Sequence, residues 1–217
     1  MNCWVNLLLL IALSGAPLAH GLKVATIQFE SRDGAFEENL ATATKLIQQA
    51  KKQGAQLVLL PEFALIGYQL SSDMWHSGEN IQGSTLAAFS SLAKKYQLYL
   101  GTTLLEVEGE DFYNTFVVVD PAGKLLGSVR KHKPAGAEGY FFKGHKNHHV
   151  IDSPIGAIGV GICQENSRCF LPKQLHLGGA TLCLCHSLTR ILVPLVVLPR
   201  REGHILRVGM QINLAFR

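Results

Sequence analysis

The sequence is poor in cysteine, with five in 217 residues. Cys3 lies in the first 21 residues, and the last third of the chain holds the other four: Cys163, Cys169, Cys183 and Cys185. These are too few and too clustered for a disulfide framework. Cys183 and Cys185 alternate with leucines before His186, without the spacing of the common zinc motifs. We expect these two thiols to pack in a core, with a metal site including His186 as the alternative.

The sequence also lacks an apolar run that could span a membrane near its start. The run at Leu7–Ala12 is far shorter than the ~20 residues that cross a bilayer, so a membrane anchor is the weaker alternative. It is followed by small residues and a proline in Ser14–Gly21, which resembles the end of a secretory signal peptide. We therefore expect residues 1–21 to be a leader that directs the protein to secretion or to the periplasm.

Basic residues are not arranged for nucleic acid. The net charge is +4, and the segment after Cys163 carries seven basic and two acidic residues. No basic stripe is interleaved with aromatic side chains, so no nucleic-acid partner is expected. With 47% apolar and 17% charged residues, the rest of the chain, 22–217, has the composition of one globular α/β domain.

Apolar periodicity and turn residues predict alternating strands and helices. The apolar runs predict strands at Lys23–Phe29, Gln56–Glu62, Tyr99–Leu105 and Ala180–Cys185, with a hairpin formed by Tyr113–Asp120 and Lys124–Val129. A further strand is predicted within Ser153–Asn166. Apolar residues at helical spacing predict helices at Phe36–Gln53, Ser84–Tyr96 and Phe170–Leu177. Strand, helix, strand order is typical of a parallel pair with the helix on one face of the sheet.

The stretch Ser153–Asn166 is the first candidate for chemistry. Its apolar run is broken by three glycines and ends at Cys163, followed by Gln, Glu and Asn. A buried strand would thus deliver one thiol to the point where the strand stops, which suits a nucleophile. The alternative is that Cys163 is a small apolar residue inside the sheet.

Charged residues at two other places complete a candidate site. Glu62 ends the predicted strand Gln56–Glu62, and ligands gather beyond the carboxyl ends of strands in open α/β sheets. Burial there would raise the pKa of this carboxyl towards the range of a general base. Lys131, Lys133 and Glu138 lie in the loop after the predicted hairpin. Taken singly, each of these residues could equally be a solvated surface charge.

Together these residues resemble the carbon–nitrogen hydrolase (nitrilase) superfamily, in which Glu, Lys and Cys occur in this order. The resemblance is carried by Leu60–Tyr68, by the Asp-Pro-Ala-Gly hairpin that leads to Arg130 and Lys131, by Glu138, and by Gly161–Asn166. It covers about Lys23 to Ser187 and implies an α-β-β-α sandwich. After about residue 187 the sequence diverges, although Leu206–Phe216 is weakly similar to a helix and strand found later in the family.

The resemblance also implies roles. Cys163 would attack an amide or nitrile carbon, with Glu62 as general base and Lys131, rather than Lys133, as the cation that stabilises the oxyanion. Glu138 would orient Lys131 or position water, and the backbone amide of Gln164 would help to hold the oxyanion. Neither a metal nor an organic cofactor is implied.

Substrate preference is indicated by one departure and by aromatic residues. Many nitrilases carry Trp directly after the cysteine, where this chain has Gln164, so an amide-type small molecule is favoured and a nitrile is the second choice. Pocket candidates are Tyr68, Trp75, Tyr140 and Phe141. Family members usually self-associate, which implies a homo-oligomer.

Two other functions stay open from the sequence. The divergent end favours a catalytically inactive, truncated fragment, or a remnant of this fold that only binds a partner. A Cys–His hydrolase is the third reading, with His132, His145, His148 or His149 as the base.

Overall fold

A computed structural model describes residues 22–68, 70–146, 148–167, 170–186, 196–197 and 208–216. The expected leader and Cys169 lie outside these residues. The α-helices are α1 (Phe36–Lys52), α2 (Ser84–Tyr96) and α3 (Phe170–Leu177). Short 3-10 helices are η1 (Ser72–Ser77), η2 (Gly136–Tyr140) and η3 (Cys163–Ser167). None of the described helices is long and apolar enough to cross a membrane.

The strands form two sheets. The six-stranded sheet has the order β10-β1-β2-β3-β4-β5, and the four-stranded sheet has the order β6-β7-β8-β9. The first sheet comprises β1 (Leu22–Phe29), β2 (Leu57–Leu59), β3 (Tyr99–Glu108), β4 (Asp111–Val119), β5 (Leu125–Arg130) and β10 (Val208–Phe216). The second comprises β6 (Val150–Ile151), β7 (Ile158–Ile162), β8 (Leu182–His186) and β9 (Val196–Val197).

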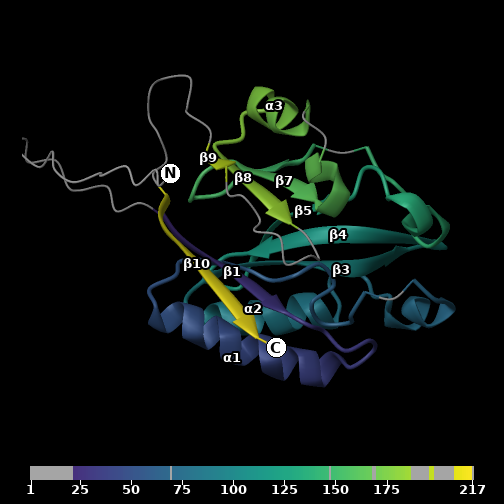
Figure 1. Ribbon diagram of the computed structural model, residues 1–217, viewed down its shortest axis with the longest axis horizontal. Coiled ribbons are helices and arrows are strands. Elements are labelled where there is room, and N and C mark those ends of the chain that lie inside the picture. The colour runs from purple at the N-terminus through teal and green to yellow at the C-terminus, as the bar shows by residue number, and fades with distance from the viewer. Residues whose placement is uncertain are drawn as a thin grey trace, which may run out of the picture.

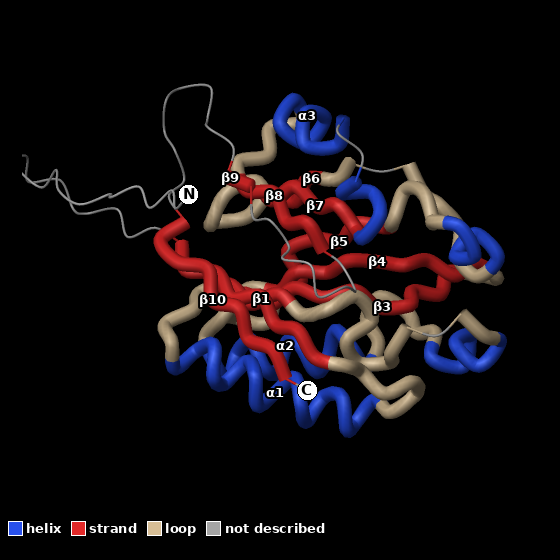
Figure 2. Tube along the Cα trace, in the orientation of Figure 1, coloured by secondary structure: helices blue, strands red, loops and turns tan. Residues whose placement is uncertain are grey.

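The two sheets face each other between layers of helix (Figure 1). Helices α1 and α2 cover the outer face of the six-stranded sheet, and α3 lies on the far side of the four-stranded sheet (Figure 2). Between the sheets, Leu57, Leu59 and Phe116 pack with Val160 and Leu184 of the facing sheet in one buried cluster. The expected α-β-β-α arrangement is therefore confirmed.

Local sequence explains the first β-α-β unit. Helix α1 buries one apolar stripe that includes Leu46 and Ile47, with acidic residues in its first turn and basic ones in its last, as the helix dipole favours. Gly54 follows at φ 85°, a left-handed conformation that glycine adopts without strain, and the chain then turns into β2. Strands β1 and β2 are parallel, as predicted, and β3 pairs with β2 in the same direction.

The turn at Asp120–Gly123 shapes the hairpin that leads to Lys131. Asp120 Oδ1 accepts hydrogen bonds from the backbone amides of Ala122 (2.9 Å) and Lys124 (2.8 Å), and Gly123 has φ 75°. This geometry joins β4 to β5 in antiparallel pairing. Lys131 is the residue directly after β5, so the register of the hairpin fixes where its backbone lies.

Two expectations need correction. The strand predicted at Gln56–Glu62 is shorter and ends at Leu59, because the chain turns at Pro61 and Glu62. The predicted hairpin and both later helices are confirmed. Within Leu206–Phe216, where a helix and a strand were expected, the described residues form the single strand β10 beside β1. Its apolar residues alternate at a period of two, which is a strand pattern.

Candidate active site

Cys163 stands where β7 ends, as expected. All residues of β7 are buried, while Cys163 is half-buried and opens η3. Its φ is 52°, an unusual conformation for a residue with a Cβ. Such strain persists only where the surroundings hold it, and it turns the backbone sharply out of the sheet. The thiol is therefore presented at a strand end.

Glu62 is held in a turn after β2. The next residue, Phe63, has φ 51° and donates its backbone N–H to Thr103 Oγ1 at 2.7 Å. This bond ties the turn to β3, and Glu62 is only 1% exposed. The carboxylate is thus withdrawn from water on a rigid support.

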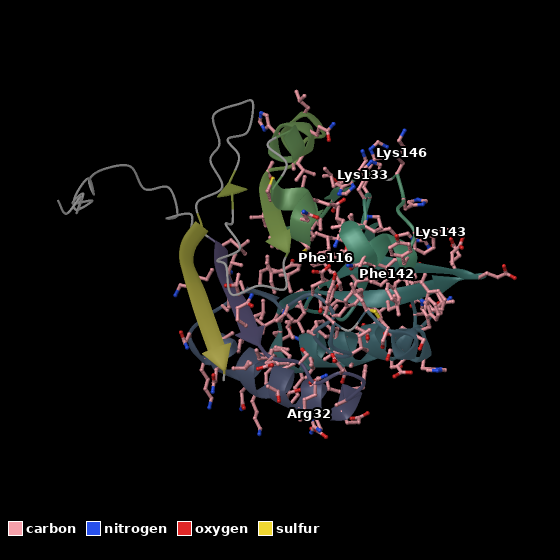
Figure 3. All side chains as sticks on the ribbon, turned by 45° about the vertical axis from the view of Figure 1, so that its right-hand side comes forward. Arg32, Phe116, Lys133, Phe142, Lys143 and Lys146 are labelled. Atoms are coloured by element: carbon pink, nitrogen blue, oxygen red, sulfur yellow. The ribbon has the colours of Figure 1, made fainter. Side chains whose placement is uncertain are left out.

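Lys131 reaches two carboxylates. Its Nζ donates to Glu62 Oε1 at 3.2 Å and to Glu138 Oε1 at 2.7 Å, and the lysine is fully buried. Its backbone N–H donates to the carbonyl of Asn114 at 2.8 Å, which continues the β4–β5 pairing by one residue. Lys133, the rival candidate, is exposed at the surface (Figure 3). The geometry therefore favours Lys131 as the lysine of the site.

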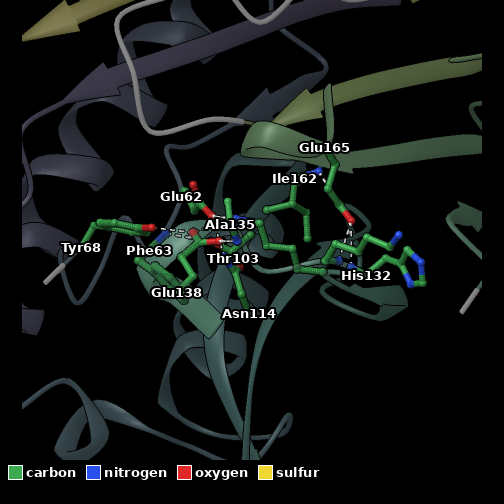
Figure 4. Close-up of polar contacts among 12 residues, drawn as sticks. Glu62, Phe63, Tyr68, Thr103, Asn114, His132, Ala135, Glu138, Ile162 and Glu165 are labelled. Carbon is green, nitrogen blue, oxygen red and sulfur yellow. Dashed lines mark hydrogen bonds and ion pairs between the residues drawn. The ribbon is translucent and has the colours of Figure 1, made fainter. Parts of the chain in front are cut away.

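Glu138 anchors the lysine from η2. Its Oε1 also accepts a hydrogen bond from the hydroxyl of Tyr68, and its Oε2 accepts the backbone N–H of Ala135 at 2.6 Å. Both oxygens are thus occupied, which makes Glu138 better placed to orient Lys131 than to take up a proton. Figure 4 shows Glu62, Tyr68 and Glu138 converging on one point.

Asn114 is a site residue that the sequence analysis did not identify. It is fully buried on β4, and its Nδ2 donates to Glu62 Oε1 at 2.6 Å. Glu62 Oε2, by contrast, has no hydrogen-bond partner in the described part of the chain. The signal available in the sequence was an amide side chain inside the apolar run Tyr113–Asp120, where only a partnered polar group is tolerated.

The pKa values of Glu62, Lys131 and Cys163 depend on burial and on the charges of one another. Burial is the main reason that the pKa of Glu62 lies above its ordinary value, although the charge of Lys131 opposes the rise. Burial alone would lower the pKa of Lys131, but the charge of Glu62 and the bond to Glu138 outweigh it and raise that pKa. Burial, followed by the charge of Glu62, raises the pKa of Cys163 to about 11 against the opposing charge of Lys131. At neutral pH the thiol therefore keeps its proton until a base removes it.

Glu165, also not identified from the sequence, lies two residues after Cys163. It is buried in η3, and its Oε1 accepts the backbone N–H of His132 at 2.8 Å. Its Oε2 accepts the backbone N–H of Ile162 at 3.0 Å. This carboxylate therefore links the chain beside Cys163 to the chain beside Lys131 (Figure 4).

The pocket candidates divide into two groups. Tyr68 joins the site through Glu138, whereas Tyr140 is 86% exposed. Trp75 packs on Phe141 with ring centroids 5.8 Å apart and donates to its carbonyl at 3.4 Å. Tyr140 lies at the exposed end of η2, and its contact with a substrate stays a prediction.

Two of the histidines considered as a base have a ring nitrogen that faces a backbone carbonyl. His132 Nδ1 faces the carbonyl of His145 at 3.3 Å, and His149 Nδ1 faces the carbonyl of Val160 at 2.9 Å. No group of three or more potential metal ligands occurs among the described residues. Cys183 is buried against Leu175, in agreement with core packing. The side chain of Cys185 lies outside the described part.

Comparisons with known proteins identify a family. Residues 23–194 match the family model described as carbon-nitrogen hydrolase. A nitrilase from Pyrococcus abyssi is 34% identical, covering 65% of this chain and 55% of its own length, and a citrullinase from Francisella tularensis is 31% identical, covering 75% and 60%. The chain thus spans little more than half the length of these relatives.

Solved structures give the same result for the fold. An amidase of the nitrilase superfamily from Nesterenkonia superposes with a TM-score of 0.72 at 21% identity, over 80% of this chain and 68% of that one. A nitrilase-superfamily member from Saccharomyces cerevisiae superposes with a TM-score of 0.67 at 26% identity, over 76% and 64%. The chain belongs to the carbon–nitrogen hydrolase family.

Proposed function

We propose that the chain hydrolyses a non-peptide carbon–nitrogen bond of a small amide through Cys163, Glu62 and Lys131. The observation that carries this proposal is the buried chain of contacts Glu62–Lys131–Glu138 placed against a half-buried thiol. Burying a cation between two carboxylates is costly, and groups with perturbed pKa values that converge in this way mark functional sites.

In the first half-reaction, Glu62 takes the proton of Cys163 as the sulfur attacks the carbonyl carbon. The free Oε2 of Glu62 is the atom available for that proton. Negative charge develops on the carbonyl oxygen, where the ammonium of Lys131 and the backbone amide of Gln164 would stabilise it. When the carbon–nitrogen bond breaks, Glu62 returns the proton to the leaving nitrogen, and a thioester with Cys163 remains.

In the second half-reaction, water attacks the thioester carbon and gives a proton to Glu62. Collapse of the tetrahedral intermediate breaks the carbon–sulfur bond, and the sulfur recovers the proton from Glu62 as the acid departs. Glu138 keeps Lys131 in place throughout, since both of its oxygens are already engaged.

An amide-type substrate is favoured over a nitrile. Gln164 stands where many nitrilases have Trp, and one relative is named a citrullinase, a second an N-carbamoylputrescine amidase. The first test is a panel of simple amides, carbamoyl compounds and nitriles with the full chain and with Cys163→Ala. Hydrolysis that disappears in Cys163→Ala, with an unchanged circular dichroism spectrum, supports the proposal. Turnover that persists in this variant removes the thiol mechanism.

An inactive or partner-binding form is the second candidate, because the pKa of the Cys163 thiol is raised to about 11 and the site therefore holds no preformed thiolate at neutral pH. Iodoacetamide labelling with mapping of the cysteines separates the two. Labelling confined to Cys163 and slowed in Lys131→Ala indicates an assembled site, whereas indiscriminate labelling indicates that none forms. Export by residues 1–21 and self-association complete the proposal, and they are tested by N-terminal sequencing of secreted protein and by light scattering.

A further inference from the structure

Within the described residues, Glu165 forms three hydrogen bonds, all with backbone amides. Its Oε2 accepts from Ile162 at 3.0 Å, and its Oε1 accepts from His132 at 2.8 Å and from Lys133 at 3.4 Å. The residue is buried. A buried carboxylate that takes no part in the proposed reaction needs a reason, because an apolar residue at this place would avoid the cost of burying its charge.

The amides that it holds lie in β7 of one sheet and in the loop that follows β5 of the other. Ile162 is the last residue of β7 in the four-stranded sheet and directly precedes Cys163. His132 directly follows Lys131, which leaves β5 at the edge of the six-stranded sheet. One side chain thus spans the gap between the sheets at the place where thiol and ammonium must meet.

We propose that Glu165 is a positioning residue that fixes the distance between the Cys163 thiol and the Lys131 ammonium. The inference rests on the proposed function, since it assigns the carboxylate to the arrangement of the same site. Glu165 touches neither the substrate nor the reacting atoms. It acts through the two backbone segments that carry them.

The chemistry of the contacts requires a carboxylate. Ionised Glu accepts on both oxygens, whereas Gln accepts on one and places an NH₂ group at the other, facing a backbone N–H. Glu165→Gln therefore keeps the size of the side chain but loses one end of the link. Glu165→Asp keeps the charge but is shorter by one methylene, so it cannot reach both segments from the same backbone.

Loss of the hydrogen bonds of Glu165 should change the pKa of Cys163, which can be measured. Cys163 is faced by Glu62, Lys131 and Glu138, and the charge of Lys131 is the influence that lowers the pKa of the thiol. If Lys131 is no longer held against the thiol, this influence weakens. The pKa of Cys163 then rises further, and less thiolate is present at any given pH.

The test is the rate of Cys163 alkylation by iodoacetamide across neutral and alkaline pH, in the full chain. For Glu165→Gln we expect the midpoint to move up by about one pKa unit, which lowers the rate at neutral pH about tenfold. Glu110→Gln, an exposed glutamate in the β3–β4 turn, is the matched control and is expected to label like the wild type.

If Glu165 only stabilised the fold, Glu165→Gln would lower the midpoint of thermal unfolding without moving the pH profile of Cys163 alkylation. That result overturns the inference. If Glu165→Gln does not fold, as judged by near-ultraviolet circular dichroism, Glu165→Asp is used, and the same shift is expected. Failure of both variants to fold also overturns it, in favour of a folding role. Absence of hydrolysis in the wild type would reject the proposed function alone, because alkylation needs no substrate.

Discussion

Replacing Lys131 by Met tests the buried charge arrangement most directly. Met preserves most of the volume of the lysine but removes the ammonium that neutralises Glu62 and Glu138. Removing one partner of a buried ion pair typically costs about 3–5 kcal/mol. For a chain of this size, each kcal/mol lowers the thermal midpoint by about 2–4 °C, so we expect a fall of roughly 6–20 °C at neutral pH.

The loss of stability in Lys131→Met should depend on pH, in a direction set by the pKa of Glu62. Lys131 is the largest influence that lowers the pKa of Glu62, so this pKa, already raised by burial, rises further in the variant. A carboxyl whose folded pKa exceeds its unfolded value contributes stability below the unfolded pKa and loses it as the pH rises through the folded one. Lys131→Met should therefore be closest to the wild type at acid pH and fall behind as the pH increases.

The assay is a thermal melt at several pH values, with Lys143→Met as the control. Lys143 Nζ lies 2.6 Å from Asp111 Oδ1, a distance like that of the buried pair, but its side chain is 63% exposed. Exposed pairs of this kind contribute little. The reasoning is that burial makes the charge of Lys131 important for stability. It would be refuted if the thermal midpoint fell equally in the two variants, or if its fall in Lys131→Met did not depend on pH.

Three further predictions concern the same site. Glu62→Gln should abolish hydrolysis yet move the alkylation of Cys163 to lower pH, because the charge of Glu62 raises the pKa of the thiol; an unmoved pH profile would contradict this. Asn114→Ala should lower kcat/KM by about 10- to 100-fold, as expected for the loss of a hydrogen bond to a charged group worth about 1.5–3 kcal/mol; a variant as active as the wild type would show that this bond does not matter. Tyr68→Phe removes the hydroxyl bonded to Glu138 and should lower kcat by up to about tenfold with the fold intact, measured by steady-state kinetics with circular dichroism as the control.

Much of the fold was predictable because it depends on local pattern. Helix Ser84–Tyr96 was predicted with its observed bounds, since its buried apolar residues recur at helical spacing. Strand ends were less predictable: β2 stops at Leu59, because the turn of Pro61 and Glu62 is fixed by a bond from Phe63 to Thr103, distant in sequence. Strand β10 shows the same limit, because its pairing with β1 is a contact between the two ends of the described chain.

The reactive groups could be predicted for a different reason. Cys163, Lys131 and Glu62 each stand at or just after the end of a predicted strand, where ligands gather in α/β folds. Glu62 and Lys131 follow β2 and β5 of one sheet, and Cys163 follows β7 of the facing sheet. Tyr140 shows a limit of that logic: it is next but one to Glu138 in sequence, yet η2 directs it to solvent. Position along the chain locates a backbone, but the direction of a side chain depends on the turn that carries it.

Asn114 and Glu165 could not be assigned from sequence because their roles exist only across elements. Asn114 donates to Glu62, and Glu165 joins the segments that carry Cys163 and Lys131. Both are buried polar groups whose cost must be offset by partners. In this site the charged groups that do chemistry and the polar groups that hold them have the same signature, burial with hydrogen bonds to distant elements. An unpartnered oxygen does not separate them, since both Glu62 Oε2 and Asn114 Oδ1 lack a hydrogen-bond partner in the described chain. Chemistry separates them, because the carboxylate of Glu62 can take up a proton and the amide of Asn114 cannot.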